Sequence, residues 1–311
     1  MPNKQLEGLD QNTKSRGILY AISAYALWGV LPLYWKALQQ VPAGEILANR
    51  ILWSFVFVSL LLLFNGGWRD LKQVFANRRN LVAVFLGSFL ISANWLTYIW
   101  AVNNDKIVEA SLGYYINPLF TIFLGLVVLK ERIDRWQVAA LLLALVGVMV
   151  MTIQYGQLPW VSLLLALTFG LYGLVKKQST LKPITGLALE TLIVTPLALG
   201  YLVYLNATEN GSFGTASPEI TLLLILSGIV TATPLLLFAQ GAKRVSLSTL
   251  GFIQYLSPSI SLLLGVFLFK EPFTWVEFVS FGFIWLGLGL YSFSRKDVFV
   301  YIRKRWFGQQ V

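Results

Sequence analysis

Two stretches of this chain share one pattern: residues 112–131 read LGYYINPLFTIFLGLVVLKE, and residues 250–271 read LGFIQYLSPSISLLLGVFLFKE. Each begins with Leu-Gly-aromatic. In each, a glycine follows the proline (Pro118 or Pro258) by seven residues, and Lys-Glu begins five residues after the glycine. Four features in the same order indicate an internal duplication, with 140 residues between the two prolines.

The composition points to a membrane. Of 311 residues, 57% are hydrophobic and 12% are charged, and the mean hydropathy is +0.69. Soluble domains carry about 25% charged residues, so this composition argues against a soluble enzyme, and it is too apolar for a disordered chain. The chain contains neither Cys nor His, which removes thiol and imidazole chemistry and the usual zinc and haem ligands. No phosphate-binding loop or acidic metal cluster is seen, so we expect no cofactor and no metal.

Apolar segments long enough to cross a bilayer recur along the chain. A helical crossing needs about 20 predominantly apolar residues. The sequence therefore predicts an all-α polytopic membrane protein with ten transmembrane helices, over residues 17–38, 45–65, 81–102, 108–129, 136–154, 159–175, 184–205, 219–240, 247–269 and 275–294.

The placement of the basic residues predicts the orientation. If the N-terminus is cytoplasmic, 20 of the 24 Lys and Arg residues lie on the cytoplasmic side, and Lys36, Lys106 and Lys270 lie outside, with Arg50 inside a span. This positive-inside bias places both termini in the cytoplasm and accounts for the net charge of +10 without nucleic acid. Residues 1–16 and 295–311 are then cytoplasmic tails, the second a basic and aromatic membrane-surface anchor.

The duplication spans five crossings, an odd number. The two copies, residues 17–154 and 159–294, must therefore cross the membrane in opposite directions. Inverted repeats of this kind build many secondary transporters. The alternative is a duplicated scaffold with no transport role.

Four further stretches carry a family resemblance: WGVLPLYWK (28–36), EILANRILWS (45–54), NWLTYIWAVN (94–103) and TATPLLLFAQGA (231–242). With the two Pro…Gly…Lys-Glu ends, they resemble the EamA family of the drug/metabolite transporter superfamily, and within it the RarD-type permeases, over about residues 15–295. The resemblance implies a multi-pass permease of the bacterial inner membrane that exports small metabolites or drugs.

Polar residues inside the spans are the candidate site residues, because such groups usually face a cavity or a partner. Arg50 can grip a substrate carboxylate, pair with Glu45, or extend to the outer headgroups. Asn94, with Trp95 and Tyr98, can form a substrate-binding wall or join two helices. Tryptophans near the outer end of the first span, Trp28 and Trp35, fit an interfacial belt equally well.

The two intramembrane prolines add further candidates. Pro118 and Pro258 free backbone carbonyls and can act as kinks or hinges. Their polar neighbours are predicted to bind substrate: Tyr114, Asn117, Gln254 and Tyr255.

Buried carboxyl groups are the candidates for proton coupling. Glu190 lies inside the seventh span and aligns with Asn49 when Pro42 is matched to Pro183. A buried carboxyl group can take up a proton near neutral pH, so Glu190 is the first candidate and Glu45 the second. A structural hydrogen bond is the alternative for Glu190. Glu131 and Glu271, at the span ends, can act as gate latches or remain solvated charges.

The sequence as a whole predicts a secondary transporter, not an enzyme, that works by alternating access around a mid-membrane cavity with a small-molecule substrate. A lipid flippase or a passive channel is the alternative, and a membrane enzyme acting on a lipid-linked substrate a more distant one. Monomer and homodimer both stay open.

The predicted topology can be tested with reporter fusions. A reporter joined after Gly308 should be active only in the cytoplasm, because an even number of crossings returns the chain to its starting side. A periplasmic signal would contradict ten spans.

Overall fold

A computed structural model describes residues 3–65, 71, 74, 77–104 and 106–294 of the protein. The predicted basic tail (295–311) lies outside these residues, as do Arg69 and Lys72 of the charge count.

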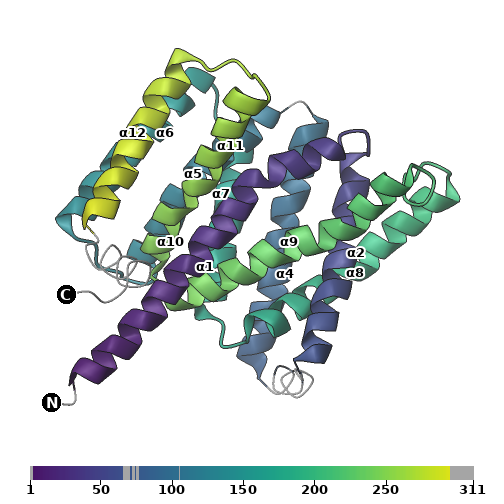
Figure 1. Ribbon diagram of the computed structural model, residues 1–311, viewed down its shortest axis with the longest axis horizontal. Coiled ribbons are helices and arrows are strands. Elements are labelled where there is room, and N and C mark those ends of the chain that lie inside the picture. The colour runs from purple at the N-terminus through teal and green to yellow at the C-terminus, as the bar shows by residue number, and fades with distance from the viewer. Residues whose placement is uncertain (1–2, 66–70, 72–73, 75–76, 105, 295–311) are drawn as a thin grey trace, which may run out of the picture.

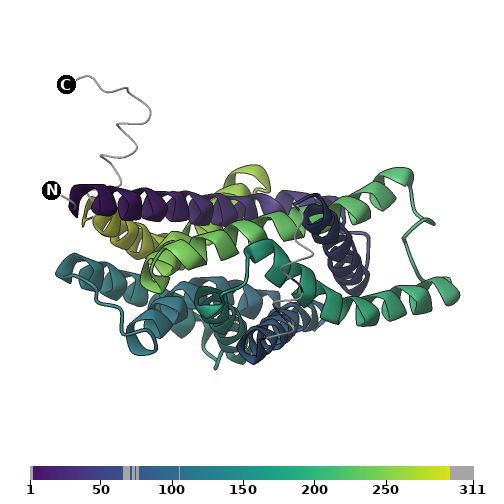
Figure 2. The same cartoon turned by 90° about the horizontal axis from the view of Figure 1, so that it is seen from below.

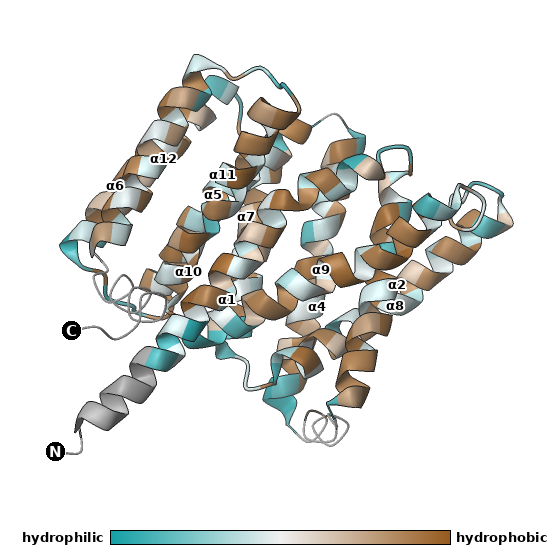
Figure 3. Cartoon of the chain, in the orientation of Figure 1, coloured by the Kyte–Doolittle hydropathy of each residue, from teal (hydrophilic) through white to brown (hydrophobic). Residues whose placement is uncertain are grey.

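Ten helices within the described residues are long and apolar enough to cross a membrane, which confirms the predicted all-α fold. Figure 3 shows the apolar residues along these helices and polar residues in several of the connections. The elements are α1 (Asn3–Ala37), α2 (Ala43–Phe64), α4 (Arg78–Asn103), α5 (Ile107–Val127), α6 (Arg135–Tyr155), α7 (Trp160–Gln178), α8 (Pro183–Ala207), α9 (Pro218–Arg244), α10 (Leu247–Gln254), α11 (Leu256–Leu263), the π-helix η1 (Leu264–Leu268) and α12 (Trp275–Ser294).

Local sequence signals set several helix ends. The Asp134 side chain accepts the amides of the first turn of α6, and Gln137 completes a capping box. The same helix ends at Gly156, whose φ of 72° suits glycine. Helix α1 begins at Asn3, so residues 3–16 of the segment predicted as a cytoplasmic tail (1–16) continue the first helix.

The helices form two layers, one containing α1, α9 and the segment α10–α12, the other α4–α7 (Figure 2). Helices α2 and α8 close one edge of the bundle, and α6 and α12 close the other (Figure 1).

The packing pairs follow the internal repeat. A shift of five crossings relates α1 to α7, α2 to α8, α4 to α9, α5 to α10–η1, and α6 to α12. Under this exchange the α1–α9 contact becomes α7–α4, α2–α9 becomes α8–α4, and α5–α7 becomes α10–α1, and all six contacts are present. The pairs α2–α8, α5–α10 and α6–α12 map onto themselves. The bundle therefore has the pseudo-two-fold arrangement expected of an inverted repeat.

The two intramembrane prolines have different effects. The ninth span is interrupted at Tyr255, between α10 and α11, three residues before Pro258. Proline has no N–H and its ring clashes with the carbonyl four positions earlier, which here belongs to Gln254. Helix α5 runs through Pro118 without interruption.

Helices α2 and α9 pack closely against each other at Gly228. A Cβ atom there would lie 2.2 Å from the carbonyl carbon of Trp53. The Ser54 hydroxyl donates to the Gly228 carbonyl at 3.1 Å across the same contact. Small residues allow this approach between membrane helices.

We expect Gly228→Ala to lower the free energy of unfolding by about 1–3 kcal/mol, because the new methyl group would meet backbone atoms that cannot move aside. Gly200→Ala is the matched control, since a Cβ at Gly200 meets nothing within 4 Å. The control should be neutral or stabilise the helix by up to about 1 kcal/mol. Unfolding titrations with SDS in mixed micelles measure both, and equal effects would contradict the close approach.

Candidate functional site

A cavity of about 340 Å³ lies between the two layers. Its walls come from both halves of the chain: α1, α2, α4 and α5 from the first, and α7, α9, α10 and α11 from the second. Seven of the eight residues predicted to bind substrate line the cavity: Arg50, Asn94, Trp95, Tyr98, Tyr114, Asn117 and Gln254. The predicted hinge residue Pro258 lines it as well.

The other predicted residues lie outside this lining. Tyr255 is fully buried, packs with Ala144 and Ile284, and its hydroxyl donates to the Tyr115 carbonyl at 3.3 Å. Pro118, Glu45 and Glu190 are buried elsewhere in the bundle.

Among the described residues that line the cavity, Arg50 is the one with a charged side chain. Its Nε donates to the Thr231 hydroxyl at 2.9 Å, and its Cζ lies 4.6 Å and 5.3 Å from the ring centroids of Trp35 and Trp95. Among the described residues no carboxylate pairs with it. The cavity therefore presents a guanidinium group held over aromatic rings and free to bind an anion.

Glu45 does not pair with Arg50. Its Oε1 accepts the backbone amides of Ser212 and Phe213 at 2.7 Å and 2.8 Å. The carboxyl group thus anchors the connection between α8 and α9. Residues five apart leave a helix about 140° apart, which explains why the pair allowed by the sequence does not form.

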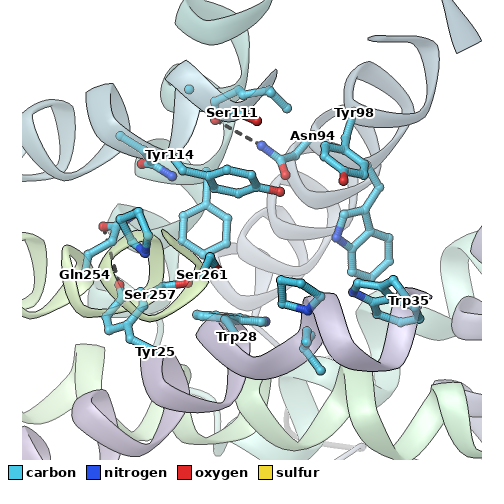
Figure 4. A pocket seen from close by; sticks show the side chains of 18 of the residues that line it. Tyr25, Trp28, Trp35, Asn94, Tyr98, Ser111, Tyr114, Gln254, Ser257 and Ser261 are labelled. Carbon is cyan, nitrogen blue, oxygen red and sulfur yellow. Dashed lines mark hydrogen bonds between the residues drawn. The ribbon is translucent and has the colours of Figure 1, made fainter. Parts of the chain in front are cut away.

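Asn94 and Gln254 supply opposite polar groups to the cavity. The amide nitrogen of Asn94 donates to the Leu165 carbonyl at 3.0 Å and to the Thr168 hydroxyl at 2.9 Å, so its carbonyl oxygen is left to accept. Gln254 Oε1 accepts from the Tyr25 hydroxyl at 3.4 Å, so its amide group is left to donate. Figure 4 shows both side chains at the cavity with Tyr114 between them.

The cavity is closed toward the end of the bundle that carries the α7–α8 connection. Trp28 and Phe169 line the cavity with ring centroids 5.6 Å apart. Tyr25, which also lines the cavity, and Tyr172 and Phe238 behind these rings are at most 2% exposed. The cavity residues that stay exposed, Ser111 and Tyr114, lie in the first two turns of α5, near the α4–α5 connection at the opposite end.

A buried ion pair lies beyond this aromatic cluster. Lys176 Nζ lies 2.6 Å from both carboxylate oxygens of Glu190, and their side chains are 5% and 4% exposed. The Tyr172 hydroxyl donates to Glu190 Oε2 at 3.2 Å. Gly87 gives the carboxylate its space, because a Cβ there would lie 2.5 Å from Oε1.

From the sequence alone, Trp28 and Trp35 fit an interfacial belt as well as they fit a binding site. The sequence predicted no role for Thr231 or Phe169. Tyr25, Trp28, Pro32 and Trp35 recur at intervals of three, four and three residues, so they share one helix face. This spacing is the sequence signal that could have grouped the four residues, and their shared face lines the cavity. Thr231 and Phe169 carry no comparable signal, because their position depends on which helices meet.

Comparisons with known proteins agree with this architecture. The EamA-like transporter family matches residues 15–153 and 159–293. The chain is 47% identical to the uncharacterized transporter YojE of Bacillus subtilis, over 90% of this chain and 94% of that protein. It is 41% identical to the protein RarD of Escherichia coli K12, over 91% and 96%. A solved crystal structure superposes with a TM-score of 0.69 at 18% identity, covering 91% of this chain and 99% of that one, which bears on the fold alone.

Proposed function

Because the chain belongs to the EamA-like transporter family, we propose that this membrane transporter exports small organic anions by alternating access. Arg50 carries the proposal. It is the one charged side chain in a central cavity, and no carboxylate of the described residues lines that cavity or pairs with it. A cation without an anionic partner in a low-dielectric site favours an anionic ligand.

The lining suits an anion with an apolar body. The guanidinium fork can bind a carboxylate with two parallel hydrogen bonds. Trp28, Tyr98 and Tyr114 offer ring faces to the rest of the molecule. A volume of about 340 Å³ lies at the lower end of small-molecule sites, so a metabolite or a small drug fits better than a lipid.

The charge bias of the connections supports a cytoplasmic location of both termini, in a bacterial inner membrane. In that orientation the exposed residues Ser111 and Tyr114 face outward, and the aromatic cluster around Tyr172 closes the cytoplasmic side. The five-helix units 17–154 and 159–294 then rock about the cavity, with the break at Tyr255 as a hinge. Export is the direction that the resemblance implies.

Glu190 couples transport to protons in this proposal. Its carboxylate pairs with Lys176 on the far side of the aromatic cluster and bonds to Tyr172, a member of that cluster. A proton on Glu190 removes the charge that holds Lys176. The closed end then loses an ion pair, which favours its opening. Glu45 is the second candidate, and its carboxyl group anchors a loop.

Flux measurements separate this proposal from its rivals. A transporter gives saturable, gradient-driven flux in liposomes. A passive channel gives flux that does not saturate, a flippase moves labelled lipid between leaflets, and an enzyme forms product without flux.

We expect Arg50→Ala to weaken binding of carboxylates by about 30-fold or more, since a lost charge partner costs about 2 kcal/mol or more in a buried site. Benzoate and phenylacetate are the probes, compared with their neutral amides, in thermal-shift titrations and in liposome flux. Arg50→Lys should keep part of the affinity, because it retains charge but loses the fork.

Arg135→Ala is the matched control for Arg50, because Arg135 is exposed at the start of α6 and does not line the cavity. The anion proposal fails if amides bind as tightly as carboxylates, or if Arg50→Ala binds like the control.

We expect the double variant Glu190→Gln, Lys176→Gln to lose the response of flux to a proton gradient across neutral pH. The paired change avoids leaving a buried unpartnered charge, which would cost about 3–5 kcal/mol. Flux of the wild type and of Glu45→Gln should still rise with the gradient. An unchanged response in the double variant would exclude coupling through Glu190.

A further inference from the structure

The two Lys-Glu pairs end their helices in the same backbone turn. Lys130 and Lys270 both adopt left-handed conformations, with φ of 53° and 59°. The amides of Glu131 and Glu271 each donate to the carbonyl of the glycine six positions earlier, at 3.0 Å in both copies. Because the repeat is inverted, these identical turns lie at opposite ends of the bundle.

The same glycines leave room for the two carboxylates. A Cβ at Gly125 would lie 2.6 Å from Glu131 Oε2, and a Cβ at Gly265 would lie 2.7 Å from Glu271 Oε2. Each carboxylate therefore folds back over its own helix in the same pose. The two side chains are prepared for the same contact.

Within the described residues, Glu131 makes that contact and Glu271 does not. Its Oε1 accepts the amide of Leu247 at 2.7 Å, and its Oε2 accepts the amide and the hydroxyl of Ser248 at 2.8 Å and 2.6 Å. These amides begin α10, where an anion is stabilised by the unpaired N–H groups and the helix dipole. Glu131 thus ties the end of α5 to the start of its repeat partner, at the closed end.

Glu271 is exposed, and its carboxylate has no hydrogen-bond donor within the described part of the chain. The repeat relates the start of α10, which binds Glu131, to the start of α5, so the start of α5 is the corresponding partner for Glu271. There the N-cap residue, Lys106, makes no side-chain capping bond, and Ile107 and Val108 are 54% and 66% exposed. This end is the one at which the cavity residues are exposed.

A second pair of equivalent residues differs in the same way. The alignment of Pro42 with Pro183 matches Lys36 to Lys177. The Lys177 ammonium donates to the carbonyl of Val245, beside the start of α10. Lys36 Nζ instead lies 3.7 Å from the ring centroid of Phe269. Among the described residues, the lysine of this pair therefore contacts the segment before the next repeat helix at the closed end alone.

We propose that Glu131 and Glu271 are alternating latches, an inference that rests on the proposed alternating access. In the state described here Glu131 caps α10 and closes one end. When that end opens, Glu131 releases α10, and Glu271 caps the first turn of α5 and closes the other end. The bond gained offsets the bond lost, which keeps two inverted states close in free energy.

The test measures the accessibility of each end with single introduced thiols, which is direct because the chain has no cysteine. Ser111→Cys reports the end that is open here, and Ala242→Cys, at a residue with 0% exposure on α9, reports the closed end. Each is introduced into the full chain in detergent, and its reaction rate with a hydrophilic maleimide is measured.

Glu131→Gln should raise the rate at Ala242→Cys and lower it at Ser111→Cys by about three- to tenfold, the range expected from losing a helix cap. Glu271→Gln should shift both rates in the opposite directions, because it disfavours the other state. Gly125→Ala and Gly265→Ala displace the same carboxylates and should repeat the two results if a glutamine variant folds poorly.

Glu219→Gln is the matched control, because Glu219 is exposed at the start of α9 and makes neither latch contact. The latches are excluded if both thiols react in the wild type but neither Glu131→Gln nor Glu271→Gln shifts the rates beyond the control. If the thiol introduced at Ala242 reacts neither in the wild-type background nor in any variant, the result contradicts alternating access itself. The latches are then excluded as well.

Discussion

A unit that crosses a membrane five times ends on the side opposite to its start, so its second copy has to be inserted upside down. The helix contacts follow from this constraint. Each contact between α1, α2 or α5 and a helix of the other half has its counterpart among the contacts of α7, α8 and α10. Because lipid cannot satisfy backbone polar groups, every crossing is helical, and the halves meet through side chains and small residues such as Gly228 and Gly251.

The two halves share a backbone plan but have divided the charged groups between them. With Pro42 matched to Pro183, Arg50 aligns with Thr191 and Asn49 aligns with Glu190. The first half therefore contributes the cation of the cavity, and the second contributes the carboxylate of the buried ion pair with Lys176. Two equivalent positions in a duplicated fold can thus serve two different tasks, provided that each faces a different neighbour.

The two ends of the bundle differ more than the two halves do. At one end Glu131 and the contacts of Tyr25 and Trp28 with Phe238 join spans of opposite halves, and Lys177 joins α7 to the end of α9. At the other end no hydrogen bond joins the equivalent Glu271 or Lys36 to the start of α5 among the described residues, and Lys36 lies over the ring of Phe269. Near-symmetric contacts in the middle and asymmetric contacts at the ends fit the proposed alternating access, in which an inverted repeat allows a second state with the two ends exchanged.

The sequence by itself determined the ten spans, the repeat and most of the polar residues at the cavity, because length, hydropathy and the high energy of a polar group in lipid are local properties. Tertiary structure decided which faces meet. Gln254 lines the cavity while its neighbour Tyr255 packs against α6 and α12, since adjacent helical residues point about 100° apart. The carboxylate of Glu45 accepts hydrogen bonds from loop amides, and the carboxylate of Glu190 pairs with a lysine on α7. The partners of Glu45 lie in a segment remote in the chain and Lys176 lies on the span before Glu190, and packing between helices sets both distances.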